Sequence, residues 1–263
     1  MAFTGIDSYV ASAKQKIPWN KASMTTVANG WFSPFAQTGQ PGAGTLAGAS
    51  TTAGVVPDAT VAGYPSIAAF GGGNTGYLTR MEFASTVACR IAVFDRLFLA
   101  GAYAFNAATS LSAQPSYLAR EPFGTGQDCE LWIEAVTAFT GNPSIAVTYT
   151  NQAGTAARTT GTVATGLAPT IGRCIQLPLQ AGDSGIQKVE SVTATVATVG
   201  TFNVMVLRPL WFARVSIANM GDVHDIIRTG MPRVYATSAL YVMINADSTA
   251  SGLPELSMQV SNG

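Results

Sequence analysis

The segment at residues 172–212 constrains the fold most, because its apolar pattern suits β-strands and would not suit a helix. In its middle, Val192, Ala194 and Val196 alternate with serine and threonine, so apolar and polar side chains point to opposite faces of a strand. Residues 202–207 have almost no polar position. A strand of this kind is buried on both faces, in the centre of a sheet or beneath a partner. The segment therefore predicts a β-structure with a sizeable core.

Strand signals recur on both sides of this segment. Residues 127–140 and 145–149 alternate around a turn and predict a β-hairpin. Residues 80–101 are mostly apolar with scattered charges, which leaves strands or a helix open. Two last strands are predicted at residues 234–245 and 253–260.

Few helices accompany these strands. The spacing of apolar residues predicts a short amphipathic helix at residues 6–17, whose apolar face could pack on its own domain or dock on a neighbouring chain. A second short helix is predicted at residues 223–229, with Asn219 or Asp222 as its cap. The order of elements predicts an all-β fold with one or two short helices. Within that class, a β-sandwich is expected, with the jelly roll as the favoured topology.

The charge content is low and balanced. Charged residues make up 11% of the 263 residues, against about 25% in an ordinary soluble domain. This composition predicts that an assembly covers much of the surface, although a neutral surface rich in threonine, serine and asparagine would also explain it. Lysine plus arginine equals aspartate plus glutamate, at 14 each, so no net field favours nucleic acid, an anionic membrane or acidic ligands.

The cysteines indicate neither disulfides nor a metal site. Cys89, Cys129 and Cys174 are odd in number and far apart, so they are expected to be buried thiols. The start of the sequence lacks the pattern of a signal peptide, and the longest apolar runs are too short for a membrane-spanning helix. We therefore expect synthesis in a reducing cytoplasm, with no cofactor and no membrane partner.

Residues 1–79 are predicted to form an extended N-terminal arm on a body at residues 80–263. Between residues 22 and 79 the only charged residue is Asp58, and small or flexible residues dominate. Aromatic residues placed among them suit an arm that becomes ordered in grooves of another subunit. The alternative is a long irregular loop packed on its own sheet. The candidate partner-binding residues are Trp19, Trp31, Phe32, Phe35, Tyr64 and Phe70.

The tetrapeptide GDSG at residues 182–185 resembles the sequence around a serine-protease nucleophile. The order Ser184, Asp222, His224 also suits some esterases. However, the sequence has no G-x-S-x-G elbow, and Asp222 and His224 lie awkwardly close for a mutual hydrogen bond. Ordinary turn chemistry explains the motif better, and His224 is better explained by a capped, solvated helix end.

Two further patterns are weaker. The glycines at residues 71–76 fit G-x-G-x-x-G, with Asp95 at the spacing of a ribose-binding acid, but no alternating βαβ units accompany them. A hinge between arm and body is the preferred interpretation. Glu130 and Glu134 share one strand face and could form a glycosidase-like carboxylate pair. The simpler interpretation is that both glutamates face solvent.

Two stretches carry a family resemblance. Residues 177–210, LPLQAGDSGIQKVESVTATVATVGTFNVMVLRPL, resemble a recurrent segment of auxiliary virion structural proteins in tailed bacteriophages. Trp19-Asn20-Lys21, Trp31 and the Gly/Pro-rich residues 39–44 resemble the start of the same group. The resemblance implies a non-enzymatic particle component, such as a capsid decoration (cement) protein that clamps neighbouring shell subunits. It defines no binding residues that can be matched position by position.

The expected function is therefore that of a virion structural protein on the capsid exterior, made in the host cytoplasm. Its expected partners are the major capsid protein and copies of itself, a trimer being one arrangement that the resemblance allows. The leading alternative is a tail, baseplate or fibre component, including a host-glycan-binding module. A hydrolase that uses Ser184 or the Glu130 and Glu134 pair is the third class.

Overall fold

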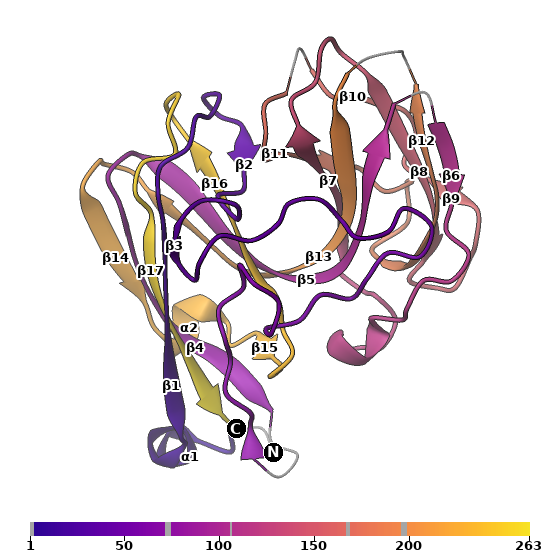
Figure 1. The fold of residues 1–263 in the computed structure, drawn as a ribbon. Coiled ribbons are helices and arrows are strands. Elements are labelled where there is room, and N and C mark those ends of the chain that lie inside the picture. Colours follow the sequence, from indigo (N-terminus) through magenta and orange to yellow (C-terminus); the bar gives the residue numbers. More distant parts are fainter. Residues whose placement is uncertain (1–2, 72–74, 106, 167–168, 196–198) are drawn as a thin grey trace.

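The computed structural model describes residues 3–71, 75–105, 107–166, 169–195 and 199–263. Nearly all of its regular structure is β-strand (Figure 1). Its helices include α1 (Ile6–Ala11), α2 (Ile226–Thr229) and the 3-10 turn η2 (Leu118–Arg120). The predicted all-β fold with one or two short α-helices is confirmed.

A closed barrel forms the middle of the molecule. Its strands, in order among the described residues, are β11 (Arg173–Leu177), β2 (Trp31–Phe32), β16 (Leu240–Ala246), β5 (Cys89–Ala104), β13 (Thr201–Val215) and β7 (Glu130–Thr137). The two longest, β5 and β13, are antiparallel partners over most of their lengths. Residues 202–208 of β13 are all buried, which confirms the two-sided burial predicted for this run.

A six-stranded sheet covers one side of the barrel. Its order is β14 (Met220–His224), β4 (Gly76–Ser85), β17 (Glu255–Asn262), β1 (Lys14–Lys21) and β3 (Gly39–Gln40), and β15 (Arg233–Val234) pairs with β4 outside this order. Trp19, Met81 and Leu256 of the sheet share one apolar core with Ile91 and Val242 of the barrel.

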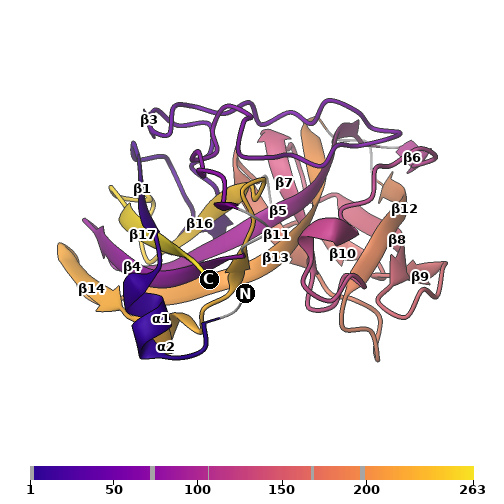
Figure 2. The same cartoon turned by 90° about the horizontal axis from the view of Figure 1, so that it is seen from below.

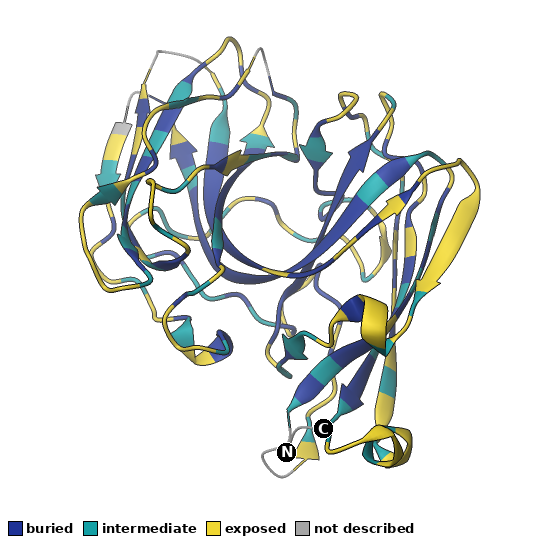
Figure 3. Cartoon of the chain, turned by 180° about the vertical axis from the view of Figure 1, so that it is seen from behind, coloured by how far each residue is buried: buried dark blue, intermediate teal, exposed yellow. Residues whose placement is uncertain are grey.

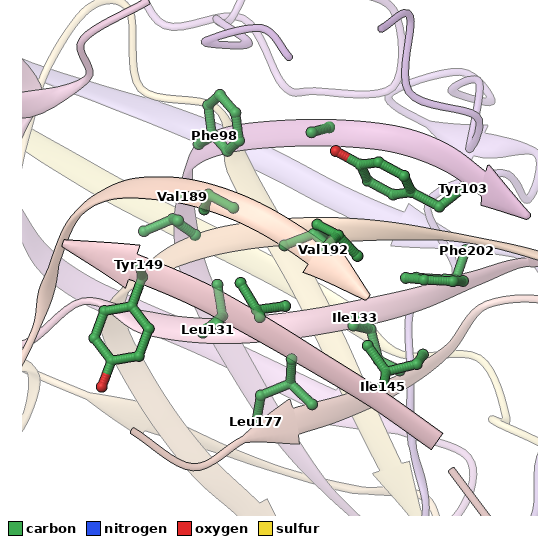
Figure 4. Packing of buried hydrophobic residues seen from close by; sticks show 14 of the residues in the cluster. Phe98, Tyr103, Leu131, Ile133, Ile145, Tyr149, Leu177, Val189, Val192 and Phe202 are labelled. Atoms are coloured by element: carbon green, nitrogen blue, oxygen red, sulfur yellow. The ribbon is translucent and has the colours of Figure 1, made fainter. Parts of the chain in front are cut away.

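A five-stranded sheet lies on the other side (Figures 1 and 2). It contains β10 (Val163–Ala164), β8 (Ser144–Asn151), β12 (Ile186–Thr195) and β6 (Ala107–Ser110), with β9 (Arg158–Thr159) beside β8. Figure 4 shows how Ile145 and Val192 of this sheet pack with Ile133 and Phe202 of the barrel. The molecule is thus a β-sandwich whose central layer is a barrel.

Strand β7 shows how the barrel serves two cores at once. Leu131 and Ile133 belong to the core beneath the five-stranded sheet, whereas Trp132 belongs to a third cluster formed by barrel strands and the covering segment. Because side chains alternate along a strand, Glu134 shares the inward face with Trp132. The closed barrel therefore has its own interior, separate from the two layers outside it.

Residues 1–79 do not form the expected arm that leaves the body. β1 lies between β17 and β3, and β2 completes the barrel between β11 and β16. The expected boundary after residue 79 falls inside β4. The predicted helix at residues 6–17 ends at Ala11, and Ile17 is a buried residue of β1. The irregular segment at residues 41–71 runs along the barrel and back (Figure 2). The alternative of a long loop packed on its own sheets describes this region.

Two local predictions, the β-hairpin and the start of the second helix, are wrong. β7 and β8 do not form a hairpin: among the described strands β7 pairs with β11 and β13, and β8 pairs with β9, β10 and β12. The chain crosses from the barrel to the outer sheet between them. Residues 220–224 form a strand, so helix α2 begins only after Asp225, whose side chain caps it in place of Asn219 or Asp222. The helix ends at Thr229, and Gly230 is its C-cap.

Candidate functional site

Most of the aromatic residues expected to bind a partner are covered by the chain's own fold. The half-buried ones are Trp31 and Phe70, and the buried ones are Trp19, Phe32, Phe35 and Tyr64. The structure brings Phe35 and Tyr64 together, with ring centroids 4.8 Å apart. In this conformation the four buried side chains are not available to another subunit.

A buried ion pair lies where Phe35 enters the barrel interior. Arg96 Nη2 is 3.5 Å from Glu134 Oε2, and neither side chain is exposed. The Arg96 guanidinium lies 3.6 Å from the ring centroid of Tyr241 and 4.9 Å from that of Phe35. The Tyr241 hydroxyl donates to Glu134 Oε1, and burial raises the pKa of Tyr241 well above its ordinary value. Such pairing is what a buried charge requires.

Asn203 connects this ion pair to the segment that crosses the barrel. Its Nδ2 donates to Glu134 Oε2 at 3.1 Å and to the carbonyl oxygen of Leu46 at 2.6 Å. Its Oδ1 accepts from the backbone N–H of Gly48 at 2.9 Å. The barrel interior therefore provides polar partners for the backbone of an almost uncharged segment, and this explains why the segment packs on its own barrel.

Asp95 forms a second buried charge centre. Its carboxylate pairs with Arg120 at 2.9 Å and Arg208 at 3.3 Å, and it accepts from Ser238 Oγ at 2.7 Å. A carboxylate enclosed in this way holds strands and loops together, so the role of a ribose-binding acid is wrong for Asp95. Residues 72–74 of the glycine pattern expected to accompany it lie outside the described residues.

Of the residues considered as an esterase triad, His224 Nε2 lies 3.9 Å from Asp222 Oδ2, but Ser184 is not brought to them. Ser184 Oγ donates to Gln127 Oε1 at 3.1 Å, and His224 Nδ1 accepts from Trp211 Nε1 at 2.9 Å. Figure 1 places β14, which carries Asp222 and His224, and β12, which follows Ser184, on opposite sides of the molecule. Ser184 and His224 therefore form no nucleophile–base pair here.

Within the same tetrapeptide, Asp183 is the residue with the most partners. Its carboxylate accepts from Arg158 Nε at 2.9 Å, Asn151 Nδ2 at 2.7 Å and the Tyr149 hydroxyl at 2.7 Å. The hydrogen bond from Arg158, with those from Asn151 and Tyr149, lowers the pKa of Asp183 to about 2. The turn thus braces the five-stranded sheet, in keeping with the interpretation as turn chemistry.

The expectation that Glu130 and Glu134 face solvent is wrong. Glu134 is buried against Arg96, and Glu130 is half-buried, with Trp132 Nε1 donating to its Oε2 at 2.7 Å. Closure of the barrel places this face of β7 inside. Burial raises the pKa of Glu130, and the hydrogen bond from Trp132 opposes that rise.

Beside Glu130 is a groove of about 400 Å³, here called the barrel-mouth groove. Side chains from β2, β5, β7, β11 and β13 line it, and its aromatic residues are Trp31, Phe94, Trp132, Trp211 and Phe212. The Trp31 ring stands edge to face against Trp132 and Phe212, at centroid distances of 6.4 and 6.2 Å. Trp31 thus lines a groove of the kind that binds small ligands. From the sequence alone, Trp31 could not be recognised as part of a ligand site, because an aromatic residue that anchors a partner chain would look the same.

Exposed large apolar side chains concentrate along one edge of the six-stranded sheet. Ile217, Met220, Val223 and Ile227 are 65%, 53%, 42% and 84% exposed, and they are here called the β14 edge surface. Figure 3 shows that most of β14 is exposed, and the exposed residues are 220–223. Among the described strands, β14 pairs only with β4. At Val223 the backbone N–H donates to Asp222 Oδ1 at 2.7 Å, and the carbonyl oxygen accepts from Arg228 Nη1 at 3.2 Å, so side chains cover part of the strand edge.

Helix α1 presents a second exposed apolar face. Ile6 and Val10 are 71% and 68% exposed, and no residue of the helix is buried. Its few attachments include the Tyr9 hydroxyl, which accepts from Gln259 Nε2 at 3.2 Å. The sequence left open whether the apolar face of this helix packs on its own domain or docks on a neighbouring chain. In the structure, Ile6 and Val10 do not pack on their own domain.

Within the described ranges, no group of three or more histidine, cysteine, aspartate or glutamate side chains is placed to hold a metal ion. All three cysteines are free and buried, as predicted. In the same part of the chain, no helix has the length and apolar character needed to cross a membrane.

No family model and no curated protein matches the chain. Structures of infectious bursal disease virus are among the solved structures that match. A Gx strain structure covers 95% of this chain and 80% of its own, with 9% identity and a TM-score of 0.17. A Gt strain structure covers 95% and 81%, with 8% identity and a TM-score of 0.20. A structure of the infectious bursal disease virus VP2 subviral particle covers 95% of this chain and 80% of its own chain, with 9% identity and a TM-score of 0.19. Scores this low do not establish a shared fold.

Proposed function

We propose that this chain is a virion structural protein, a decoration (cement) protein that binds the assembled phage head and bridges neighbouring shell subunits. The observation that carries the proposal is the β14 edge surface. Four large apolar side chains are exposed there within residues 217–227. Single exposed apolar residues are normal on a monomer, whereas several of them close in sequence at the end of a sheet mark an interaction site.

The position of β14 at the end of its sheet supports the same proposal. Because Asp222 and Arg228 already bond the backbone of Val223, the exposed apolar side chains, and not an added strand, would provide the contact with another chain. Helix α1 supplies a second attachment through Ile6 and Val10. A protein held at two such places on different shell subunits raises the free energy needed to separate them. Each buried apolar Å² contributes roughly 25 cal/mol before the costs of association.

The low charge content fits this role. With 11% charged residues, the chain gains little affinity from long-range electrostatic attraction, so shape and apolar contact must provide it. The resemblance of residues 177–210 to auxiliary virion proteins points to the same class of partner, the major capsid protein, together with other copies of this chain.

The test is binding of the purified chain to heads that lack it, measured by cosedimentation and by quantitative mass spectrometry against the major shell protein. We expect saturation at a simple fraction of the shell subunits. Val223→Asp with Ile227→Asp should abolish binding. Val61→Asp with Phe123→Asp, which changes exposed apolar residues elsewhere, should leave it intact.

Three results would overturn the proposal. Undiminished binding by the Val223 and Ile227 variant would exclude the β14 edge surface. A native content of only a few dozen copies per particle would favour the tail, baseplate or fibre alternative, and absence from particles would exclude a virion role.

A further inference from the structure

The barrel-mouth groove differs from an ordinary apolar depression in its charge. Glu130 is the one charged side chain among the described residues that line it. None of the ion pairs formed within the described part of the chain includes Glu130. Its hydrogen-bond donor is the neutral indole N–H of Trp132. A half-buried carboxylate in this setting has no cation to offset its loss of hydration.

Aromatic rings surround this carboxylate. Trp132 is in contact with Phe94 as well as with Trp31, at ring-centroid distances of 6.0 and 6.4 Å. Phe212 is 55% exposed and stands against Trp31 at the rim. The faces of indole and phenyl rings carry negative partial charge and attract cations, most strongly where water is excluded.

We propose that the barrel-mouth groove binds an organic cation, an ammonium or guanidinium group carried on an apolar stem. The rings would contact the stem and the cation, and Glu130 would supply the opposite charge. A neutral ligand of the same shape would leave the carboxylate uncompensated, so the charge of the groove selects against it. This inference does not depend on a role in the virus particle.

The structure provides an internal precedent for this chemistry. Inside the same barrel, Arg96 lies against the rings of Tyr241 and Phe35 and pairs with Glu134, two positions along β7 from Trp132. There the chain supplies its own guanidinium to aromatic rings and a glutamate. At the mouth, the rings and Glu130 are present without one.

The cation has two sources, a free small molecule or a basic side chain of a partner. Titration calorimetry and tryptophan fluorescence would be used with choline, with N-acetyl-arginine amide and with N-acetyl-lysine amide. The control ligand is 3,3-dimethylbutan-1-ol, the uncharged isostere of choline. Tighter binding of choline than of both capped amino acids would identify a small quaternary ammonium, and the reverse order a side chain.

Two variants test the residues. Glu130→Gln keeps the shape and an acceptor for Trp132, and it should weaken cation binding at least about ten-fold. Phe212→Ala, at the exposed rim, should weaken it less. Glu82→Gln, which removes an exposed carboxylate paired with Arg80, should leave it unchanged. Three results would overturn the inference: equal binding of choline and its uncharged isostere, no effect of Glu130→Gln, or no cation bound with a Kd of about 1 mM or tighter.

Discussion

The guanidinium of Arg96 lies 3.6 Å from the ring centroid of Tyr241, and the hydroxyl of the same ring donates to Glu134. One aromatic side chain therefore contacts both members of a fully buried ion pair. The ring, the cation and the carboxylate are all withdrawn from water, and they stabilise one another together with Asn203, which donates to Glu134, and Phe35, which lies against Arg96. The stability of the barrel interior therefore depends on this charged group as well as on the apolar side chains around it.

Removing only one member of this pair should destabilise the protein strongly. Arg96→Met leaves Glu134 buried without its cation, and we expect a loss of about 3–5 kcal/mol in the free energy of unfolding. Arg96→Met with Glu134→Gln should lose less than the sum of the single changes. A double-mutant cycle by urea denaturation measures this coupling.

The matched control is Arg80→Met, since Arg80 pairs with Glu82 on the surface at 2.9 Å. There the expected loss is below about 1 kcal/mol. Equal effects of the two arginine substitutions would show that the buried pair contributes no more than an exposed one.

Deletion of residues 1–79 should prevent folding, in contrast to what an independent arm would allow. It removes β1 from the six-stranded sheet and β2 from the barrel, together with the buried Trp19 and Phe32. Deletion of residues 1–11 should leave a cooperative thermal transition, because α1 has no buried residue. Circular dichroism and calorimetry distinguish these outcomes, and a cooperative transition in the longer deletion would contradict the prediction.

Asp183→Asn should lower the stability of the five-stranded sheet in a pH-dependent way. The pKa of Asp183, lowered to about 2 in the fold by Arg158 and its other donors, lies below the value of about 3.9 in an unfolded chain. Ionised Asp183 thus stabilises the fold fully above the unfolded value, and this contribution disappears as the pH falls towards 2.

We expect Asp183→Asn to cost about 2 kcal/mol at pH 7, and the difference from the native chain should shrink between about pH 5 and pH 2. Urea denaturation at a series of pH values measures it. A difference that stays constant with pH would exclude the assigned role of Asp183.

Gly126→Ala should be much more destabilising than Gly124→Ala. Both glycines have positive φ, 71° and 69°, so both alanines suffer similar backbone strain. A Cβ on Gly126 would lie only 1.9 Å from the carbonyl oxygen of Ile186, whereas nothing lies within 4 Å of one on Gly124. We expect an additional loss of about 2 kcal/mol or more for Gly126→Ala. Equal melting temperatures of the two variants would contradict this.

The sequence predicted the class of fold because strand periodicity is local. The alternation at residues 191–195 and the apolar run at residues 202–207 each describe a single strand, and both strands form as predicted. Pairing is not local. β7 and β8 adjoin in sequence with a turn between them, yet they belong to different layers. Ile133 of β7 and Ile145 of β8 would be apolar in a hairpin as well as in two separate layers, so their sequence pattern does not tell the two arrangements apart.

The interior charges could not be recognised for a similar reason. On β7, Glu130 and Glu134 alternate with Leu131 and Ile133 as they would on a half-exposed strand. The polar face became an interior face only because the barrel closes and supplies Arg96 from β5. A charge whose partner is distant in sequence leaves no local pattern.

Most of the aromatic side chains predicted to bind a partner are part of the core. The sequence does not mark the apolar residues of the β14 edge surface as exposed, because Met220, Val223 and Ile227 resemble the buried positions of any short element. Only the position of β14 at the end of a sheet makes them an exposed group.

The pairing of β1 with β17 has a consequence for how the protein is synthesised. Lys14 aligns with Ser261 and Asn20 with Glu255, so the ribosome makes β1 more than two hundred residues before its main partner. Until then, the β1 segment must remain unpaired on that edge while later strands emerge. Contacts so distant in sequence form slowly. The yield of the finished molecule should therefore depend on chaperones that protect the nascent N-terminal segment, and not on early local folding of that segment.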